Sequence, residues 1–289
     1  MSQQPGPVTT SDQPEPRPIV GHAAGVPFVA LPPRTGDRAP IVIAWHLLDP
    51  PRTEAAMAAA LPLHGLDAWR IYLGLPMSGS RLPAGGFDEL MQLASQDAVL
   101  KLHGPISSNA AEEFEPAFAS LRDQLGLGDG PVGLLGGSIG AAVAQLVLTE
   151  RSIPIRAAVL VSPVVQLRRV VEAMSRHYGV TYPWSEPSLA VARRVDFVAR
   201  ADEVAARGQP AVLFVVGQND DPGFHEPAEQ MRAALADRYA DPQRTRLVVI
   251  PGMGHAVAEE PGIEPAPQTP EAALVDREAA QWFERYLRS

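Results

Sequence analysis

Residues 131–148, PVGLLGGSIGAAVAQLVL, are the stretch that decides the fold. The apolar run 132–135 predicts a short buried strand, and the run of small residues from 141 onward predicts a helix. Between them, Gly136 to Gly140 match the pattern G-x-S-x-G, in which a strand turns sharply into a helix and exposes the serine hydroxyl. Small residues around the serine let the two backbones approach closely. We therefore interpret Ser138 as a candidate nucleophile, and a purely structural glycine turn is the alternative.

Strand-like and helix-like segments alternate along the rest of the chain. Strands are expected as two short pieces within 19–30 and at 41–45, 67–73, 157–161, 211–216 and 246–250. Helices are expected at 53–61, 110–125, 225–239 and 270–287, the first with Thr53 as its N-cap. Residues 77–109 have the composition of a long connection with a possible short helix at 87–93. The alternation predicts an α/β fold with a mostly parallel, doubly wound sheet.

Two segments stand apart from this alternation. Residues 1–18 are rich in Pro, Gln and Ser, which is typical of a disordered leader, and the remaining residues 19–289 are predicted to form one domain. Residues 164–209 separate two strands by a stretch too long for a structureless loop, so we predict a small helical cap there. Its aromatic residues Tyr182 and Trp184 either line a substrate pocket or, as we favour, pack the cap against the body.

Composition narrows the classes of function. The 289 residues carry a formal charge of −9, which disfavours nucleic acid or an anionic membrane surface as the main partner. The absence of cysteine excludes disulfides, a thiol nucleophile and thiolate metal sites. No apolar run approaches the ~20 residues of a membrane helix, and the first residues do not form a signal peptide. The expected location is therefore cytoplasmic.

A serine nucleophile needs a base and an orienting acid. Of the seven histidines, His255 has the strongest context, because it follows the last predicted strand in the glycine-rich loop 251–255. Asp220 and Asp221 follow the strand 211–216, and either carboxylate is a candidate acid. The chain order Ser138, Asp, His255 is the order in which α/β-hydrolases carry their triad.

On these residues the chain resembles the α/β-hydrolase superfamily over about 19–289, most closely the branch of esterases, dienelactone hydrolases and prolyl-oligopeptidase-type enzymes. The resemblance implies Asp220 as the acid, three residues after Gly217, whereas counting back from Pro222 favours Asp221. It also implies an oxyanion hole formed by the N–H of Ile139 and a second N–H in the loop after the strand 41–45.

The second donor of that oxyanion hole is a point where the sequence departs from the family. The family usually has His-Gly in this loop, whereas this chain has His46-Leu47-Leu48. Either Leu48 or Leu47 then supplies the N–H, although a leucine does not easily adopt a positive φ. His46 is expected to orient the loop and not to act as a second base.

These residues predict a cofactor-independent serine hydrolase that cleaves a carboxylic ester or a related acyl bond through an acyl-enzyme. A prolyl-oligopeptidase-type peptidase ranks lower, because such enzymes normally carry a large additional domain. A thioesterase, a lactonase and a non-catalytic binding protein of the same fold are further alternatives.

No metal-ligand spacing and no phosphate-binding glycine loop is present in the sequence, so the expected partner is a small acyl substrate without a cofactor or metal. The sequence does not indicate an oligomeric state.

Overall fold

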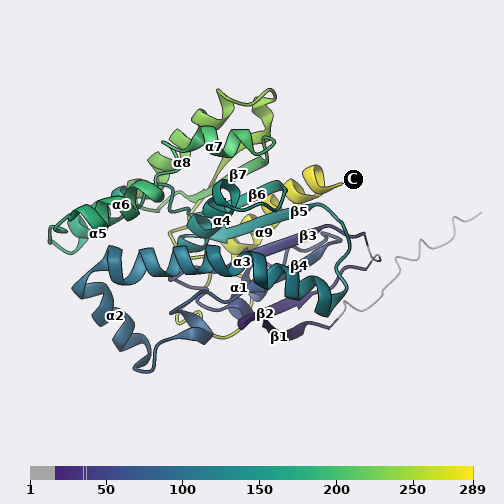
Figure 1. The fold of residues 1–289 in the computed structure, drawn as a ribbon, viewed down its shortest axis with the longest axis horizontal. Coiled ribbons are helices and arrows are strands. Elements are labelled where there is room, and N and C mark those ends of the chain that lie inside the picture. The colour runs from purple at the N-terminus through teal and green to yellow at the C-terminus, as the bar shows by residue number, and fades with distance from the viewer. Residues whose placement is uncertain (1–16, 35, 37, 289) are drawn as a thin grey trace, which may run out of the picture.

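The computed structural model describes residues 17–34, 36 and 38–288, so all but the end of the predicted leader 1–18 lies outside the described residues. Within them, eight strands form one sheet in the order β1-β2-β4-β3-β5-β6-β7-β8 (Figure 1). The strands are β1 (Ile19–Ala23), β2 (Val26–Leu31), β3 (Ile41–Trp45), β4 (Trp69–Leu73), β5 (Val132–Gly137), β6 (Ile155–Val161), β7 (Ala211–Gly217) and β8 (Thr245–Ile250). Strands β1 and β2 run antiparallel at one edge, and all pairs from β4 to β8 are parallel. The predicted α/β-hydrolase fold, with its mostly parallel sheet, is confirmed.

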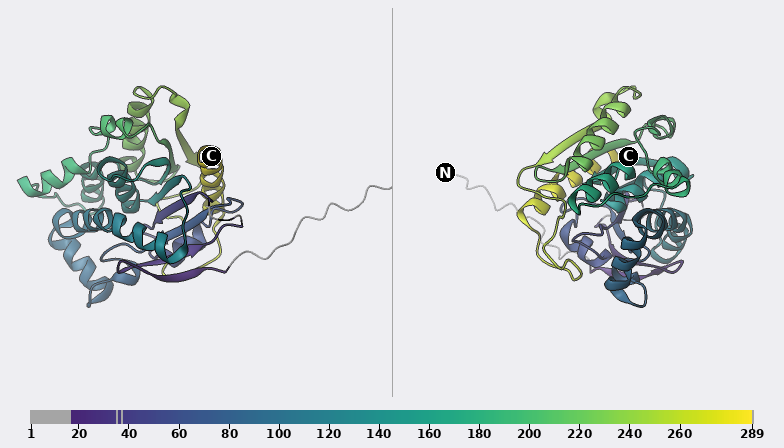
Figure 2. Two further views of the ribbon diagram at one scale, coloured as in Figure 1. Left: turned by 45° about the vertical axis from the view of Figure 1, so that its right-hand side comes forward. Right: turned by 90° about the vertical axis from the view of Figure 1, so that its left-hand side faces the viewer.

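Helices cover both faces of this sheet. The helices are α1 (Glu54–Ala60), α2 (Gly86–Gln96), α3 (Gly104–Leu125), α4 (Ile139–Glu150), α5 (Leu167–His177), α6 (Glu186–Arg194), α7 (Ala201–Ala206), α8 (Pro222–Ala236) and α9 (Pro270–Leu287). Helices α3, α4 and α8 share a buried core with one face, while α1 and α9 share a core with the opposite face (Figure 2).

The side chains of the central strands alternate between these two cores. In β7, for example, Val212, Phe214 and Val216 lie in the core with α4, whereas Leu213 and Val215 lie in the core with α9. A strand that is buried on both faces needs apolar residues at every position, and this is why β3 and β7 read as continuous apolar runs.

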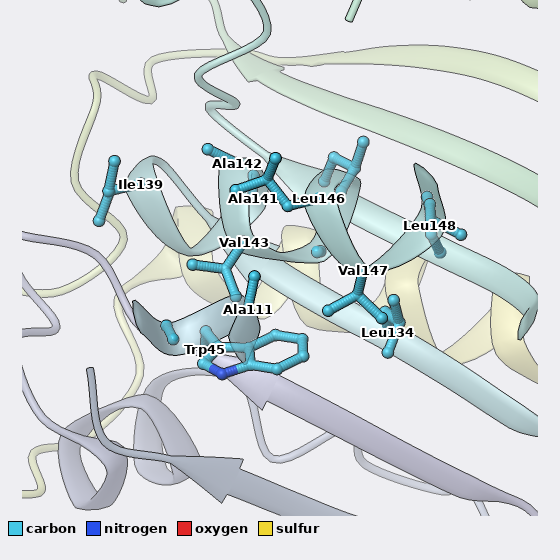
Figure 3. Close-up of a cluster of buried hydrophobic side chains, with 14 of the residues drawn as sticks. Trp45, Ala111, Leu134, Ile139, Ala141, Ala142, Val143, Leu146, Val147 and Leu148 are labelled. Carbon is cyan, nitrogen blue, oxygen red and sulfur yellow. The ribbon is translucent and has the colours of Figure 1, made fainter. Parts of the chain in front are cut away.

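Helix α4 lies at the centre of the larger core. Eleven of its twelve residues are buried, and Val143 and Val147 lie near Trp45 and Leu134 of the sheet (Figure 3). Such a helix is apolar on all sides because neighbouring elements surround it. The buried position of α4 fixes the place of Ser138, the residue directly before it.

Two stretches differ from the sequence-based prediction. The connection 77–109 contains the possible helix 87–93 as α2, but it is more helical than predicted, because it also contains the π-helical turn Ala98–His103 and the first turn of α3. The segment 164–209 is helical as predicted, but it is divided into α5, α6 and α7. Asp196, between α6 and α7, forms a β-bridge with Gln166, and their side chains share a hydrogen bond of 2.9 Å. These contacts fix the break between the two helices.

Candidate active site

Ser138 occupies a strained turn between β5 and α4. Its backbone has φ 49° and ψ −114°, a conformation that residues other than glycine rarely adopt. The two glycines of the motif let the flanking segments touch. A Cβ on Gly136 would lie 2.3 Å from the carbonyl oxygen of Gly140, and a Cβ on Gly140 would lie 2.5 Å from that of His46. Both glycines are therefore required for close contact, and the turn holds Ser138 at the carboxyl ends of the strands.

His255 and Asp220 meet Ser138 at this position. The Nε2 of His255 is 2.8 Å from the Ser138 Oγ, and its Nδ1 lies 3.0 Å and 3.1 Å from the two carboxylate oxygens of Asp220. The Asp220 side chain is 2% exposed and that of His255 is 19% exposed. The three side chains form the hydrogen-bonded series of a serine-histidine-aspartate triad.

Asp221, the alternative acid, has a different neighbourhood. Its carboxylate caps α8, because Oδ1 accepts a hydrogen bond from the N–H of Gly223 (2.7 Å). The N–H of Asp221 in turn donates to Asp220 Oδ1 (2.7 Å), which adds a donor to the buried carboxylate. Thus the geometry brings Asp220 to His255, and Asp221 supports it through the backbone.

Two backbone N–H groups, of Ile139 and of Leu48, are the candidate donors to an oxyanion at Ser138. Among the described residues, no hydrogen bond takes up the N–H of Ile139 at the start of α4 or the N–H of Leu48. The N–H of Leu47 donates to the carbonyl of Pro51 (3.2 Å). Leu48 is therefore the available second donor of the two that the sequence left open. Neither leucine has a positive φ, so the loop does not need the glycine that the family usually has.

His46 fastens the loop that carries Leu48. Its Nε2 accepts a hydrogen bond from the N–H of Leu75 (3.1 Å), which leaves the proton on Nδ1 to donate to the carbonyl of Leu47 (2.7 Å). Burial lowers the pKa of His46 to about 4, so the ring is neutral at physiological pH. His46 therefore connects the loops after β3 and β4 and does not face Ser138.

Two side chains near His255 carried no signal in the sequence. The ring of Phe224, in the first turn of α8, lies 4.2 Å from the imidazole of His255 between centroids. The carboxylate of Asp49 lies 3.8 Å from His255 Nε2, on the side of the ring that faces Ser138. Asp49 lies in a loop and Phe224 at the start of a helix, and neither position has a sequence pattern that indicates contact with His255. Only the fold brings them to the imidazole.

A cavity of about 540 Å³ opens above the triad. Ser138, Asp220, His255 and Leu48 border it, together with side chains from α2 and α5. Tyr182 and Trp184 are not among its lining residues. Their rings pack edge to face at 4.7 Å, and the hydroxyl of Tyr182 is hydrogen-bonded to Asp97 at the start of the π-helical turn. The hydrogen bond of Tyr182 joins the segment 164–209 to the region around α2.

The part of the chain that the structure describes contains neither a metal-binding cluster nor a membrane-spanning helix. No group of three or more His, Asp or Glu side chains is placed to hold a metal ion. No helix there is long and apolar enough to cross a membrane.

Solved structures with the same fold include chains of similar length and longer ones. TT1662 from Thermus thermophilus has a TM-score of 0.64 at 20% identity, over 94% of this chain and 98% of its own. Carboxyl esterase 2 from Tuber melanosporum has a TM-score of 0.54 at 15% identity, over 96% and 90%. The acylaminoacyl peptidase of Pyrococcus horikoshii has a TM-score of 0.62 at 12% identity, over 97% of this chain and 43% of its own length. At these identities the likeness shows the fold alone.

The sequence itself gives the family. No curated protein matches the chain. Residues 106–287, well over half of the chain, match the model of the prolyl oligopeptidase family, and the match includes Ser138, Asp220 and His255. The chain therefore belongs to the prolyl oligopeptidase family and is a serine hydrolase of the α/β-hydrolase fold.

Proposed function

We propose that the chain is a carboxylic ester hydrolase whose nucleophile is Ser138. The observation that carries the proposal is the series Ser138 Oγ, His255 and Asp220, with spacings of 2.8 Å and 3.0 Å, at the base of an open cavity. A serine hydroxyl becomes nucleophilic when an adjacent imidazole takes its proton, and a carboxylate on the other ring nitrogen stabilises the imidazolium.

The proposed reaction has two halves. In the first, Ser138 Oγ attacks the ester carbonyl while its proton passes to His255 Nε2, and the N–H groups of Ile139 and Leu48 donate to the developing oxyanion. The tetrahedral intermediate then expels the alcohol, which takes the proton from His255, and leaves an acyl group on Ser138. In the second half, water loses a proton to His255 and attacks the acyl-enzyme, and the tetrahedral intermediate then releases the carboxylic acid and Ser138, which recovers its proton from His255.

Ester cleavage is the least demanding reaction that this arrangement supports. An alkoxide leaves a tetrahedral intermediate more readily than an amide nitrogen, which must first be protonated. The Tuber melanosporum esterase has this fold over nearly its whole length, so a chain of this size needs no further domain for ester hydrolysis. The family match favours a peptidase as the second candidate. A peptidyl p-nitroanilide separates the two: a peptidase cleaves it, whereas an ester hydrolase turns over p-nitrophenyl acetate and leaves the anilide uncleaved.

The nucleophile is tested by replacing Ser138 with alanine. We expect Ser138→Ala to lower kcat/KM for p-nitrophenyl acetate by about 10⁴-fold or more, because only binding and oxyanion donors remain. It should also abolish labelling by a fluorophosphonate probe, measured by intact mass. Ser95→Ala, which removes an exposed serine of α2, is the matched control and should keep full activity. A Ser138→Ala variant with wild-type turnover contradicts the proposal.

A further inference from the structure

One wall of the cavity above Ser138 is formed by an exposed apolar face of α2. Phe87, Leu90, Met91 and Ala94 all line the cavity, and their spacing of three and four residues places them on one side of the helix. Apolar faces of this kind normally pack against a core. In α2, however, Phe87 is 49% exposed and Met91 is 50% exposed.

The opposite wall has the same construction. Val170, Ala173 and Met174 of α5, with His177 and Tyr178 at its end, line the same cavity and again lie three or four residues apart. Met174 is 40% exposed and Tyr178 is 67% exposed. Both helices lie at the same end of the molecule, at the left in Figure 1. The two apolar faces thus border one groove that begins at the catalytic serine.

The residues between these walls do not add charge. Leu102, Val164 and His103 line the cavity there, and His103 is 5% exposed. Burial lowers the pKa of His103 to about 4, so its imidazole is uncharged at neutral pH. None of the cavity-lining residues of α2, the π-helical turn or α5 carries a carboxylate, an ammonium or a guanidinium group. The charged lining residues, such as Asp49 and Arg52, come from the loops at the other side.

We propose that the groove between α2 and α5 binds an extended apolar group of the substrate, an alkyl chain or an aryl group, attached to the ester that Ser138 attacks. This inference rests on the proposed ester hydrolysis and names its substrate class. The groove is continuous with the catalytic serine, which points to a substrate and not to a separate partner as its occupant. Its volume of about 540 Å³ lies within the range of about 300–1,000 Å³ found for small-molecule sites.

The preference is measured with two series of esters, kept below the concentrations at which they aggregate. In the first, p-nitrophenyl esters lengthen the acyl chain from acetate to decanoate. In the second, alkyl acetates lengthen the alcohol. In one series kcat/KM should rise by about three- to four-fold for each buried methylene until the groove is filled. The series that rises identifies the side of the ester that occupies the groove.

One charged substitution on each wall tests whether this groove is responsible. Met91→Glu and Met174→Glu should each lower the ratio of kcat/KM between the octanoyl (or octyl) ester and the acetyl (or methyl) ester by at least about ten-fold, because a carboxylate must lose water when an apolar chain lies against it. Both methionines are partly exposed, so the fold tolerates the change. Val249→Glu is the matched control, since Val249 is an equally exposed apolar residue of β8 outside the cavity, and it should keep the wild-type ratio.

The outcomes separate this inference from the proposed function. A Ser138-dependent esterase with flat profiles in both series, or with wild-type ratios in both methionine variants, overturns the inference and leaves ester hydrolysis standing. If no ester is turned over, ester hydrolysis itself fails. The groove is then tested by the rates at which ethyl and octyl fluorophosphonates label Ser138, and equal rates overturn the inference.

Discussion

Ser138 and His255 lie 117 residues apart in the chain, yet their side chains come within 2.8 Å because each follows a parallel strand of the same sheet. The carboxyl ends of these strands meet at one edge, where ligands of such folds bind. The sequence therefore suffices to propose the serine, the histidine and a nearby acid. It does not suffice to choose between Asp220 and Asp221, because the direction of each carboxylate depends on the turn into α8. Only the structure shows Asp221 engaged as the cap of that helix.

The two aspartates are expected to respond differently to the same substitution. Asp220→Asn should lower kcat on p-nitrophenyl acetate by about 10³- to 10⁴-fold, because an amide favours the wrong tautomer of His255. Asp221→Asn should reduce kcat by no more than about three-fold, since asparagine is also a good helix cap. Steady-state kinetics of both purified variants decide the matter. Equal losses, or a larger loss in Asp221→Asn, would assign the acid to Asp221.

At the scale of elements, the close approach of α4 to β3 sets the geometry of the site. Gly140 lies so near the end of β3 that a Cβ there would meet the carbonyl oxygens of His46 at 2.5 Å and Trp45 at 2.6 Å. These are backbone atoms, which cannot turn away as a flexible side chain can. The turn that carries Ser138 and the loop that carries Leu48 are thus held against each other at Gly140.

Gly140→Ala should accordingly destabilise the fold and disturb the oxyanion hole together. We expect a loss of about 2 kcal/mol or more in the free energy of unfolding, as is usual for overpacked cores. Gly254→Ala is the control, since a Cβ at Gly254 meets nothing within 4 Å and its φ is not positive. Urea denaturation of the two variants gives the comparison. Similar unfolding free energies for both would contradict the proposed role of the contact.

The elements that sequence patterns miss are those determined by tertiary contacts. The bounds of β3 and α9 match the prediction, and Thr53 caps α1 with a hydrogen bond of 3.0 Å from Ala56, because local signals define these elements. In 77–109, residues such as Pro105 suggest a loop. Pro105 instead occupies the first turn of α3, where the missing N–H has no helical partner. The two helices of the groove were partly predicted, because α2 contains the possible helix 87–93 and α5 lies in the predicted cap 164–209, but their apolar faces toward the site were not.

At the scale of the whole molecule, the fold encloses two neutral imidazoles. His46 is fully buried and fastens two loops, whereas His103 lies at the junction of the π-helical turn and α3. Neither ring nitrogen of His103 has a hydrogen-bond partner among the described residues. Burial lowers the pKa of both histidines from 6.5 to about 4. In acid, protons therefore bind the unfolded chain before they bind the folded protein.

This difference makes the stability of the whole fold depend on pH in a definite window. Above pH 6.5 both states are neutral at these positions and the full stability is present, and stability falls as the pH drops from 6.5 toward 4. Each histidine should remove about 2 kcal/mol of unfolding free energy between pH 7.5 and pH 5. His103→Leu keeps a similar volume without the ionisable ring, so its loss over this interval should be smaller by about that amount. His177→Leu, the same substitution at an exposed histidine, is the matched control for the change of side chain. Urea denaturation at both pH values gives the unfolding free energies of each variant and of the wild type. An equal pH dependence in His103→Leu and the wild type would show that His103 is not a buried neutral group.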